Sequence, residues 1–142
     1  MNSKKILIFG VFDGIHDGHL HFIKEAKEKG SHLVAVVARD RVVKELKGKL
    51  PKNNEVNRIR NLLEIKDIDL VFLGDLKIGT FNILKEVKPD IIFLGYDQSA
   101  LQEDLNNKIK IGQLNNIEII MGQSYKGEEL HSSILNKKSI IN

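Results

Sequence analysis

Short apolar runs that alternate with amphipathic stretches constrain the fold of this chain more than any other feature. The first run, residues 5–11, is almost continuously apolar, as in a strand that is buried on both faces. Four further runs, at 32–38, 70–73, 90–94 and 117–121, are separated by segments with helical periodicity. Such alternation predicts parallel βαβ crossovers. We therefore expect an α/β fold, a Rossmann-like, doubly wound, five-stranded parallel sheet with helices on both faces and the first run at its centre.

The composition limits the class of protein further. A length of 142 residues, with 22 basic and 19 acidic side chains, predicts one domain over residues 1–142. The absence of cysteine excludes disulfides and thiolate metal sites. No stretch is long enough to span a bilayer and no leader pattern is present, so we expect a cytoplasmic protein with no membrane partner. A net charge of +3 is small beside the basic face of a nucleic-acid binder, so no nucleic-acid partner is expected either.

In a doubly wound sheet, ligands bind outside the carboxyl ends of the strands. The segment 10–19 joins the predicted central strand to the first helix and contains three glycines, which permit a tight turn and close approach of a ligand. The helix begins near His19, so its free amides favour an anion. His16 and His19 are spaced so that both imidazoles can donate hydrogen bonds to phosphate oxygens.

Other readings of these histidines are less well supported. A metal site would need His16, His19 and His21, whose spacing is not that of a helical zinc-binding pair, and no second cluster supplies further ligands. We expect His21 to be a surface residue. The segment also lacks the Walker and dinucleotide-binding glycine patterns.

The string Gly-Val-Phe-Asp-Gly-Ile-His-Asp-Gly-His at 10–19 resembles the Gly-x-Phe-Asp-x-x-His-x-Gly-His signature of the cytidylyltransferase-like nucleotidyltransferases. The resemblance implies that His16 and His19 hold the nucleotide triphosphate and stabilise the transition state. It implies Mg²⁺, or another divalent cation, as cofactor, with Asp13 near it. The neighbouring residues implied to bind the nucleotide are Gly10, Val11, Phe12, Asp13 and Gly18.

A second segment, residues 39–53, concentrates basic side chains. Such a run is usually a solvated face, but at the ligand edge of a sheet it would close over a triphosphate as a basic loop. The resemblance implies a functional lysine here, which we assign to Lys44 with Lys47 as the alternative. Asp40 is an expected substrate contact.

Arg58 opens the helix that follows, where the resemblance implies a substrate or phosphate contact. The alternative is a solvated arginine in a helix capped by Asn54.

Two later segments complete the predicted site. Gly95 and Asp97 resemble the family's Gly-x-Asp loop beside the base and ribose, with Tyr96 as a further substrate contact and a plain turn as the alternative. Ser132 and Ser133 match a Ser/Thr-rich helix start that binds phosphate.

The resemblance implies an enzyme that transfers a nucleoside monophosphate from ATP or CTP to a phosphomonoester and releases pyrophosphate. The serines are not preceded by Arg-Thr-Glu-Gly, and the string Leu-Gly-Tyr-Asp-Gln at 94–98 resembles archaeal FAD synthetases. FMN adenylylation is therefore expected. The alternatives are cytidylyl transfer to glycerol 3-phosphate or a sugar phosphate, and a nucleotide-binding sensor. The resemblance also implies a homodimer. The expected stacking partners for a flavin are Phe12, Phe81 and Tyr96.

Overall fold

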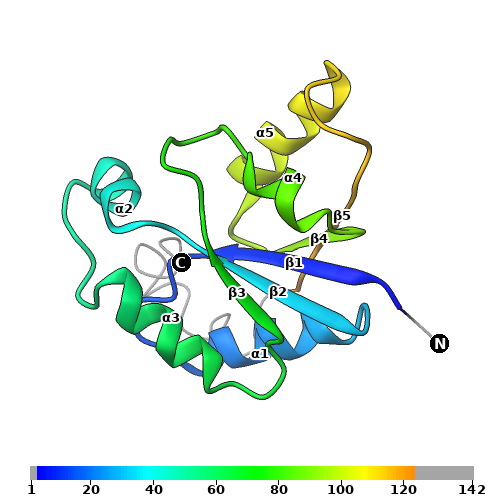
Figure 1. Ribbon diagram of the computed structural model, residues 1–142. Helices are drawn as coiled ribbons and strands as arrows, with labels where there is room; N and C mark the ends of the chain where they lie inside the picture. Colours follow the sequence, from blue (N-terminus) through cyan, green and yellow to red (C-terminus); the bar gives the residue numbers. More distant parts are fainter. Residues whose placement is uncertain (1–2, 124–142) are drawn as a thin grey trace.

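The computed structural model describes residues 3–123 and contains one five-stranded parallel sheet (Figure 1). The strand order is β3-β2-β1-β4-β5, so β1 is central and the order reverses between β1 and β4. The predicted doubly wound α/β fold is confirmed. In chain order the elements are β1 (Lys5–Gly10), α1 (Asp17–Lys27), β2 (His32–Val37), α2 (Asp40–Lys47), α3 (Glu55–Leu63), β3 (Leu70–Leu73), α4 (Ile83–Val87), β4 (Ile91–Leu94), α5 (Ser99–Lys110) and β5 (Glu118–Met121).

Helices cover both faces of the sheet (Figure 1). On one face, Ile6 and Ile8 of β1 share a buried cluster with Ile23 of α1 and Leu62 of α3. On the other face, Leu7 lies in a second cluster with residues of α4 and α5. Successive residues of a strand point to opposite faces, and both faces are covered. This explains why the predicted strands are continuously apolar.

The segment 39–53, which we expected to be a loop, contains the helix α2. Asp40 lies in its first turn, Lys44 and Lys47 lie in its last, and Gly48 ends it with a φ of +80°. These are ordinary helix start and stop signals, and the density of charge obscured them. Within residues 3–123 no helix has the length and apolar composition needed to cross a bilayer.

Some apolar residues of the amphipathic helices do not face the core. Leu20 of α1 and Val56 and Leu63 of α3 are exposed. On α3 the buried residues are Arg58 and Leu62, which lie one turn apart. The helix is thus rotated so that an arginine enters the interior.

Candidate functional site

The backbone of the loop after β1 is set by the packing of Phe12. This residue has a left-handed φ of +55°, and its ring is buried against Gly10. A Cβ atom on Gly10 would lie 2.6 Å from the Phe12 ring, so only glycine fits there. The Phe12 ring centroid lies 5.6 Å from that of His19. Phe12 therefore supports a histidine from the core, and its ring offers no free face to a nucleotide.

The structure brings His16 and His19 together at the first turn of α1. His16 caps the helix, with its Nδ1 accepting from Gly18 N at 3.0 Å. His19 Nδ1 accepts from His16 N at 3.1 Å, and the two ring centroids are 3.8 Å apart. Because Nδ1 acts as an acceptor in both rings, the proton of each neutral imidazole lies on Nε2.

His19 is buried, with 4% of its surface exposed. Burial, reinforced by the charge of His16, lowers the pKa of His19 to about 3, so the ring is neutral near neutral pH. Its Nε2 atom has no hydrogen-bond partner among residues 3–123. Leaving a buried donor without an acceptor lowers the free energy of unfolding by about 1–3 kcal/mol. Such donors often lie where a ligand supplies the acceptor.

Arg58 is completely buried and joins three segments. Its Nε donates to Asn53 O at 3.0 Å, and its Nη1 donates to Val11 O at 2.9 Å and Ala38 O at 2.8 Å. Its Nη2 lies 2.6 Å from Asp40 Oδ1. The solvated Arg58 considered above is therefore wrong, and the side chain as placed has no surface to offer a phosphate. Arg58 therefore positions the loop at 11–16, the histidine loop, rather than facing a ligand. Asp40 pairs with Arg58 through Oδ1, but its side chain is 28% exposed, so its substrate contact stays a prediction.

Asp13 forms a second tie to the loop before α3. Its Oδ2 accepts from Lys52 N at 2.7 Å, and its Oδ1 accepts from Asn53 N and Nδ2, both at 2.9 Å. Burial alone would raise the pKa of Asp13, but these hydrogen bonds and the charge of Arg58 hold it below its usual value. Both carboxylate oxygens are thus engaged.

The predicted Mg²⁺ contact of Asp13 stays a prediction. Within the part of the chain that the structure describes, no group of three or more histidine, aspartate or glutamate side chains is placed to hold a metal ion. Asp13, the expected contact, uses both oxygens within the protein. Its geometry is that of a structural tie.

The two candidate lysines differ in their surroundings. Lys44 is exposed on α2, whereas Lys47 is partly buried. Burial lowers the pKa of Lys47, the negative charge of Asp13 opposes this, and the charges of Arg58 and Lys49 add to it. Lys47, the alternative assignment, is therefore the lysine whose electrostatic surroundings include the histidine loop.

The loop after β4 is tied to β1 by a residue that sequence reasoning missed. Gln98 Oε1 accepts from Gly95 N at 2.8 Å, and Gln98 Nε2 donates to Phe9 O at 3.1 Å. This side chain bridges β1 and β4 where the strand order reverses, which is the usual ligand-binding position in such sheets. A Cβ on Gly95 would lie 2.9 Å from Asp97 Oδ1, so the turn is tight. Tyr96 is exposed in the same turn.

The remaining predicted residues divide into two groups. His21 is exposed on α1, as expected for a surface histidine, and its Nε2 lies 3.9 Å from Glu25 Oε1. Ser132 and Ser133 lie outside residues 3–123, so their proposed phosphate contacts stay a prediction.

Solved structures support this fold assignment. A crystal structure from Thermoplasma volcanium, titled as a lipopolysaccharide core biosynthesis protein, is 37% identical with a TM-score of 0.78, covering 87% of this chain and 98% of that one. A pantoate-beta-alanine ligase from Francisella tularensis has a TM-score of 0.59 at 15% identity, covering 87% of this chain and 61% of its own. The second likeness concerns the fold alone.

Curated relatives match over most of their length. An FAD synthase from Thermococcus sibiricus is 40% identical over 97% of this chain and 95% of its own. An FAD synthase from Thermoplasma volcanium is 39% identical over 94% of this chain and 92% of its own. The profile of the family described as Cytidylyltransferase-like matches residues 7–137. With the paired histidines at the end of the central strand, these matches show that the chain belongs to the cytidylyltransferase-like family of nucleotidyltransferases.

Proposed function

We propose that this protein is an FMN adenylyltransferase, which transfers AMP from ATP to FMN and releases pyrophosphate. The identity to FAD synthases supports the choice of substrates. One structural observation supports the chemistry: the buried Nε2–H of His19, beside His16 at the first turn of α1, has no partner in residues 3–123. A phosphate oxygen would accept a hydrogen bond from this N–H.

The reaction needs no protein base. The FMN phosphate is largely ionised near neutral pH, so its oxygen already carries the electron pair that attacks the α-phosphorus of ATP. A new P–O bond forms, the bond between the α-phosphorus and the bridging oxygen breaks, and pyrophosphate leaves with that electron pair. The task of the protein is to position the reactants and to stabilise the developing charge.

The described residues suit this task. His16 and His19 each present Nε2–H as a donor, and the amides at the start of α1 add a favourable field. Because the His19 ring is neutral near neutral pH, its Nε2–H donates a hydrogen bond to the phosphate and the ring takes up no proton. Lys47, with Lys44 one turn before it on α2, supplies positive charge for the departing pyrophosphate.

Further parts of the proposal rest on the family resemblance. Mg²⁺ enters on the phosphate oxygens of the nucleotide, as part of that substrate. Gly95, Asp97 and Tyr96 lie at the base and ribose, while Ser132 and Ser133 hold the distal phosphates. We also propose that the protein acts as a homodimer in the cytoplasm.

A second acceptor class has one observation in its favour. The solved relative from Thermoplasma volcanium is titled for lipopolysaccharide core biosynthesis, whereas a curated relative from the same organism is named FAD synthase. A sugar phosphate with CTP is therefore the second candidate.

An acceptor panel separates these functions. The protein is incubated with Mg²⁺, with ATP or CTP, and with FMN, glycerol 3-phosphate or a hexose 1-phosphate, and pyrophosphate and nucleotide products are quantified. We expect FAD from ATP and FMN. Turnover only with CTP and a polyol or sugar phosphate would overturn the proposal, and nucleotide binding without pyrophosphate release would indicate a sensor.

A further inference from the structure

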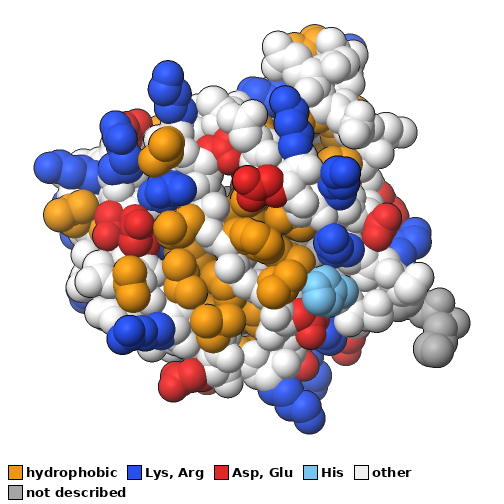
Figure 2. All heavy atoms as spheres, in the orientation of Figure 1, with side chains coloured by type: hydrophobic (Ala, Val, Ile, Leu, Met, Phe, Trp, Pro, Cys, Tyr) orange, Lys and Arg blue, Asp and Glu red, His pale blue; other side chains and the backbone are white. Residues whose placement is uncertain are grey.

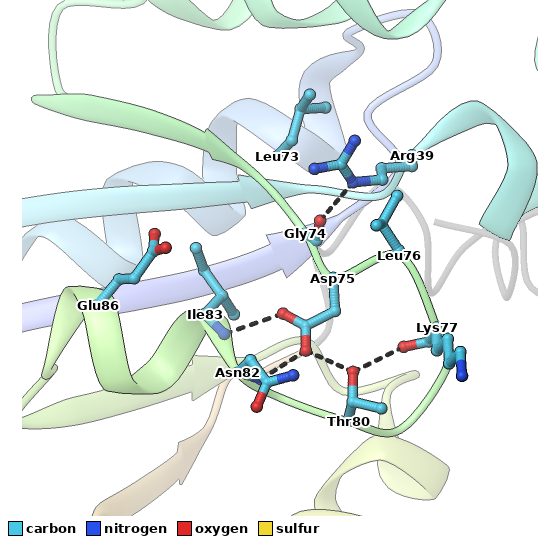
Figure 3. Close-up of a pocket in the computed structure, with 10 residues that line it drawn as sticks. All are labelled: Arg39, Leu73, Gly74, Asp75, Leu76, Lys77, Thr80, Asn82, Ile83 and Glu86. Atoms are coloured by element: carbon cyan, nitrogen blue, oxygen red, sulfur yellow. Dashed lines mark hydrogen bonds between the residues drawn. The ribbon is translucent and has the colours of Figure 1, made fainter.

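A pocket of about 560 Å³ opens where the loop from β3 to α4 passes beside Arg39 (Figure 3). Its walls come from the end of β3 and the start of α4, at the edge of the sheet where ligands bind in this architecture. Figure 2 shows the same face of the molecule, where hydrophobic side chains gather along β3 and charged side chains surround them. Nothing in the mechanism above uses this pocket.

Hydrogen bonds within the protein fix the rim of the pocket. Arg39 Nε donates to Gly74 O at 2.7 Å, which leaves the terminal nitrogens of the guanidinium for other partners (Figure 3). The Asp75 carboxylate accepts from Ile83 N at 2.9 Å and from Asn82 N, and it also contacts the Thr80 hydroxyl. The loop therefore has a defined shape before any ligand binds, as is usual for small-molecule sites.

The lining combines apolar surface with a few polar groups. Leu73, Leu76 and Ile83 supply apolar surface, Lys77 adds a cation to that of Arg39, and Glu86 adds a carboxylate. A planar heterocycle has apolar faces, carbonyl oxygens that accept from cations, and a ring N–H that donates to a carboxylate.

This combination distinguishes between the two acceptor classes. A polyol phosphate would leave the apolar wall uncovered, which argues for a ring-bearing acceptor. Phe12 and Phe81, two of the stacking partners expected for a flavin, are buried and offer no free ring face. Tyr96, the third, is exposed in the loop after β4 but does not line this pocket, whose wall is aliphatic.

The pocket is connected to the histidine loop through one buried side chain. Arg39 directly follows Ala38, whose carbonyl accepts from Arg58, and Arg58 also donates to Val11 O in the histidine loop. The ends of β1 and β3 are two strand spacings apart, roughly 10 Å. A ribityl chain can cross this gap, because it separates the phosphate of FMN from its ring.

We infer that this pocket holds the isoalloxazine ring of FMN while the FMN phosphate lies at His16 and His19. The inference rests on the proposed function, and it identifies the acceptor as a ring-bearing phosphomonoester. The pocket is a binding element and takes no part in bond making.

The test compares two leucines of equal exposure. Leu76 lines the pocket and is 54% exposed, whereas Leu63 on α3 is 55% exposed and outside it. In Leu76→Glu, a charge in the apolar wall should raise KM for FMN by about tenfold or more while KM for ATP stays within about twofold. Leu63→Glu should leave both constants unchanged. An unchanged KM for FMN in Leu76→Glu, in a protein that makes FAD, would overturn the inference.

A binding measurement separates this inference from the proposed function. Each protein is titrated against FMN alone, and the flavin fluorescence is followed. If the wild type binds FMN but makes no FAD, and FMN binding is weaker in Leu76→Glu, the proposed function is overturned. The assignment of the pocket to the flavin ring then stands. A wild type that neither binds FMN nor makes FAD would overturn both.

Discussion

The loops that follow β1 and β3 both lie at the ligand edge of the sheet, but they are held in different ways. The histidine loop is braced from a distance, since Arg58 reaches Val11 O across 47 positions of the chain. The loop from β3 to α4 is closed locally, because Asp75 is satisfied by groups five to eight residues away. The first loop also leads to a donor on His19 that has no partner in the described part of the chain, residues 3–123. The comparison indicates that the histidine loop is held by residues from distant segments, whereas the loop of the pocket is held mainly by its own residues, with one further hydrogen bond from Arg39.

Removing the long-range hydrogen bonds of Arg58 should have the largest effect, on the free energy of unfolding. Arg58→Met leaves the Asp40 carboxylate and the carbonyls of Val11 and Ala38 without their donor, which should lower the free energy of unfolding by about 3–5 kcal/mol. Urea denaturation measures this. Arg60→Met, an exposed arginine on the same helix, is the control and should change stability by less than about 0.5 kcal/mol. Equal free energies of unfolding for the two variants would contradict this role of Arg58.

Removing the Nε2–H donor of His19 should have the next largest effect. His19→Ala should reduce kcat by about two to three orders of magnitude, because one well-placed donor to developing charge contributes about 3 kcal/mol. Pyrophosphate release is the measurement, and His21→Ala on the exposed side of α1 is the control. Full turnover by His19→Ala would show that this ring nitrogen does not contact the reacting phosphates.

Lowering the pH should reduce the free energy of unfolding through His19. The pKa of His19 is lowered from 6.5 to about 3 by burial, so the unfolded chain binds a proton that the folded chain does not. The contribution of His19 is complete above its ordinary pKa of 6.5 and is lost as the pH falls towards 3. At about pH 5.5 the loss should be about 1.4 kcal/mol. Urea midpoints of the wild type and His19→Asn should converge as the pH falls, and parallel curves would contradict the burial of this ring.

The local loop should give the smallest effect. The amides of Asn82 and Ile83 donate to different oxygens of Asp75, and Asp75→Asn keeps only one of these oxygens. One amide therefore loses its acceptor, and the free energy of unfolding should fall by about 1 kcal/mol. KM for ATP should be unchanged, because the partners of Asp75 lie only in this loop and at the start of α4. A loss as large as that of Arg58→Met would mean that the two loops are not held differently.

Much of the fold follows from the sequence because strands buried on both faces must be continuously apolar. The pairing of His16 with His19 likewise follows from local spacing at the start of a helix. The burial of Arg58 could not be predicted, since its acceptors, Val11, Ala38 and Asn53, come from three separate segments. The loop at 74–82 was missed for a related reason. Its residue types are ordinary, and the pocket forms only where they meet Arg39, which comes from a distant segment of the chain.

The state of the His19 ring tests the central claim most directly. Nitrogen-15 NMR of histidine-labelled protein, with and without ATP and Mg²⁺, reports which ring nitrogen carries the proton and whether its surroundings change. We predict a neutral ring protonated on Nε2 in the free protein, and a shift of that Nε2–H resonance on nucleotide binding that His21 does not share. A His19 protonated on Nδ1, or an Nε2–H that does not respond to saturating nucleotide, would contradict the account.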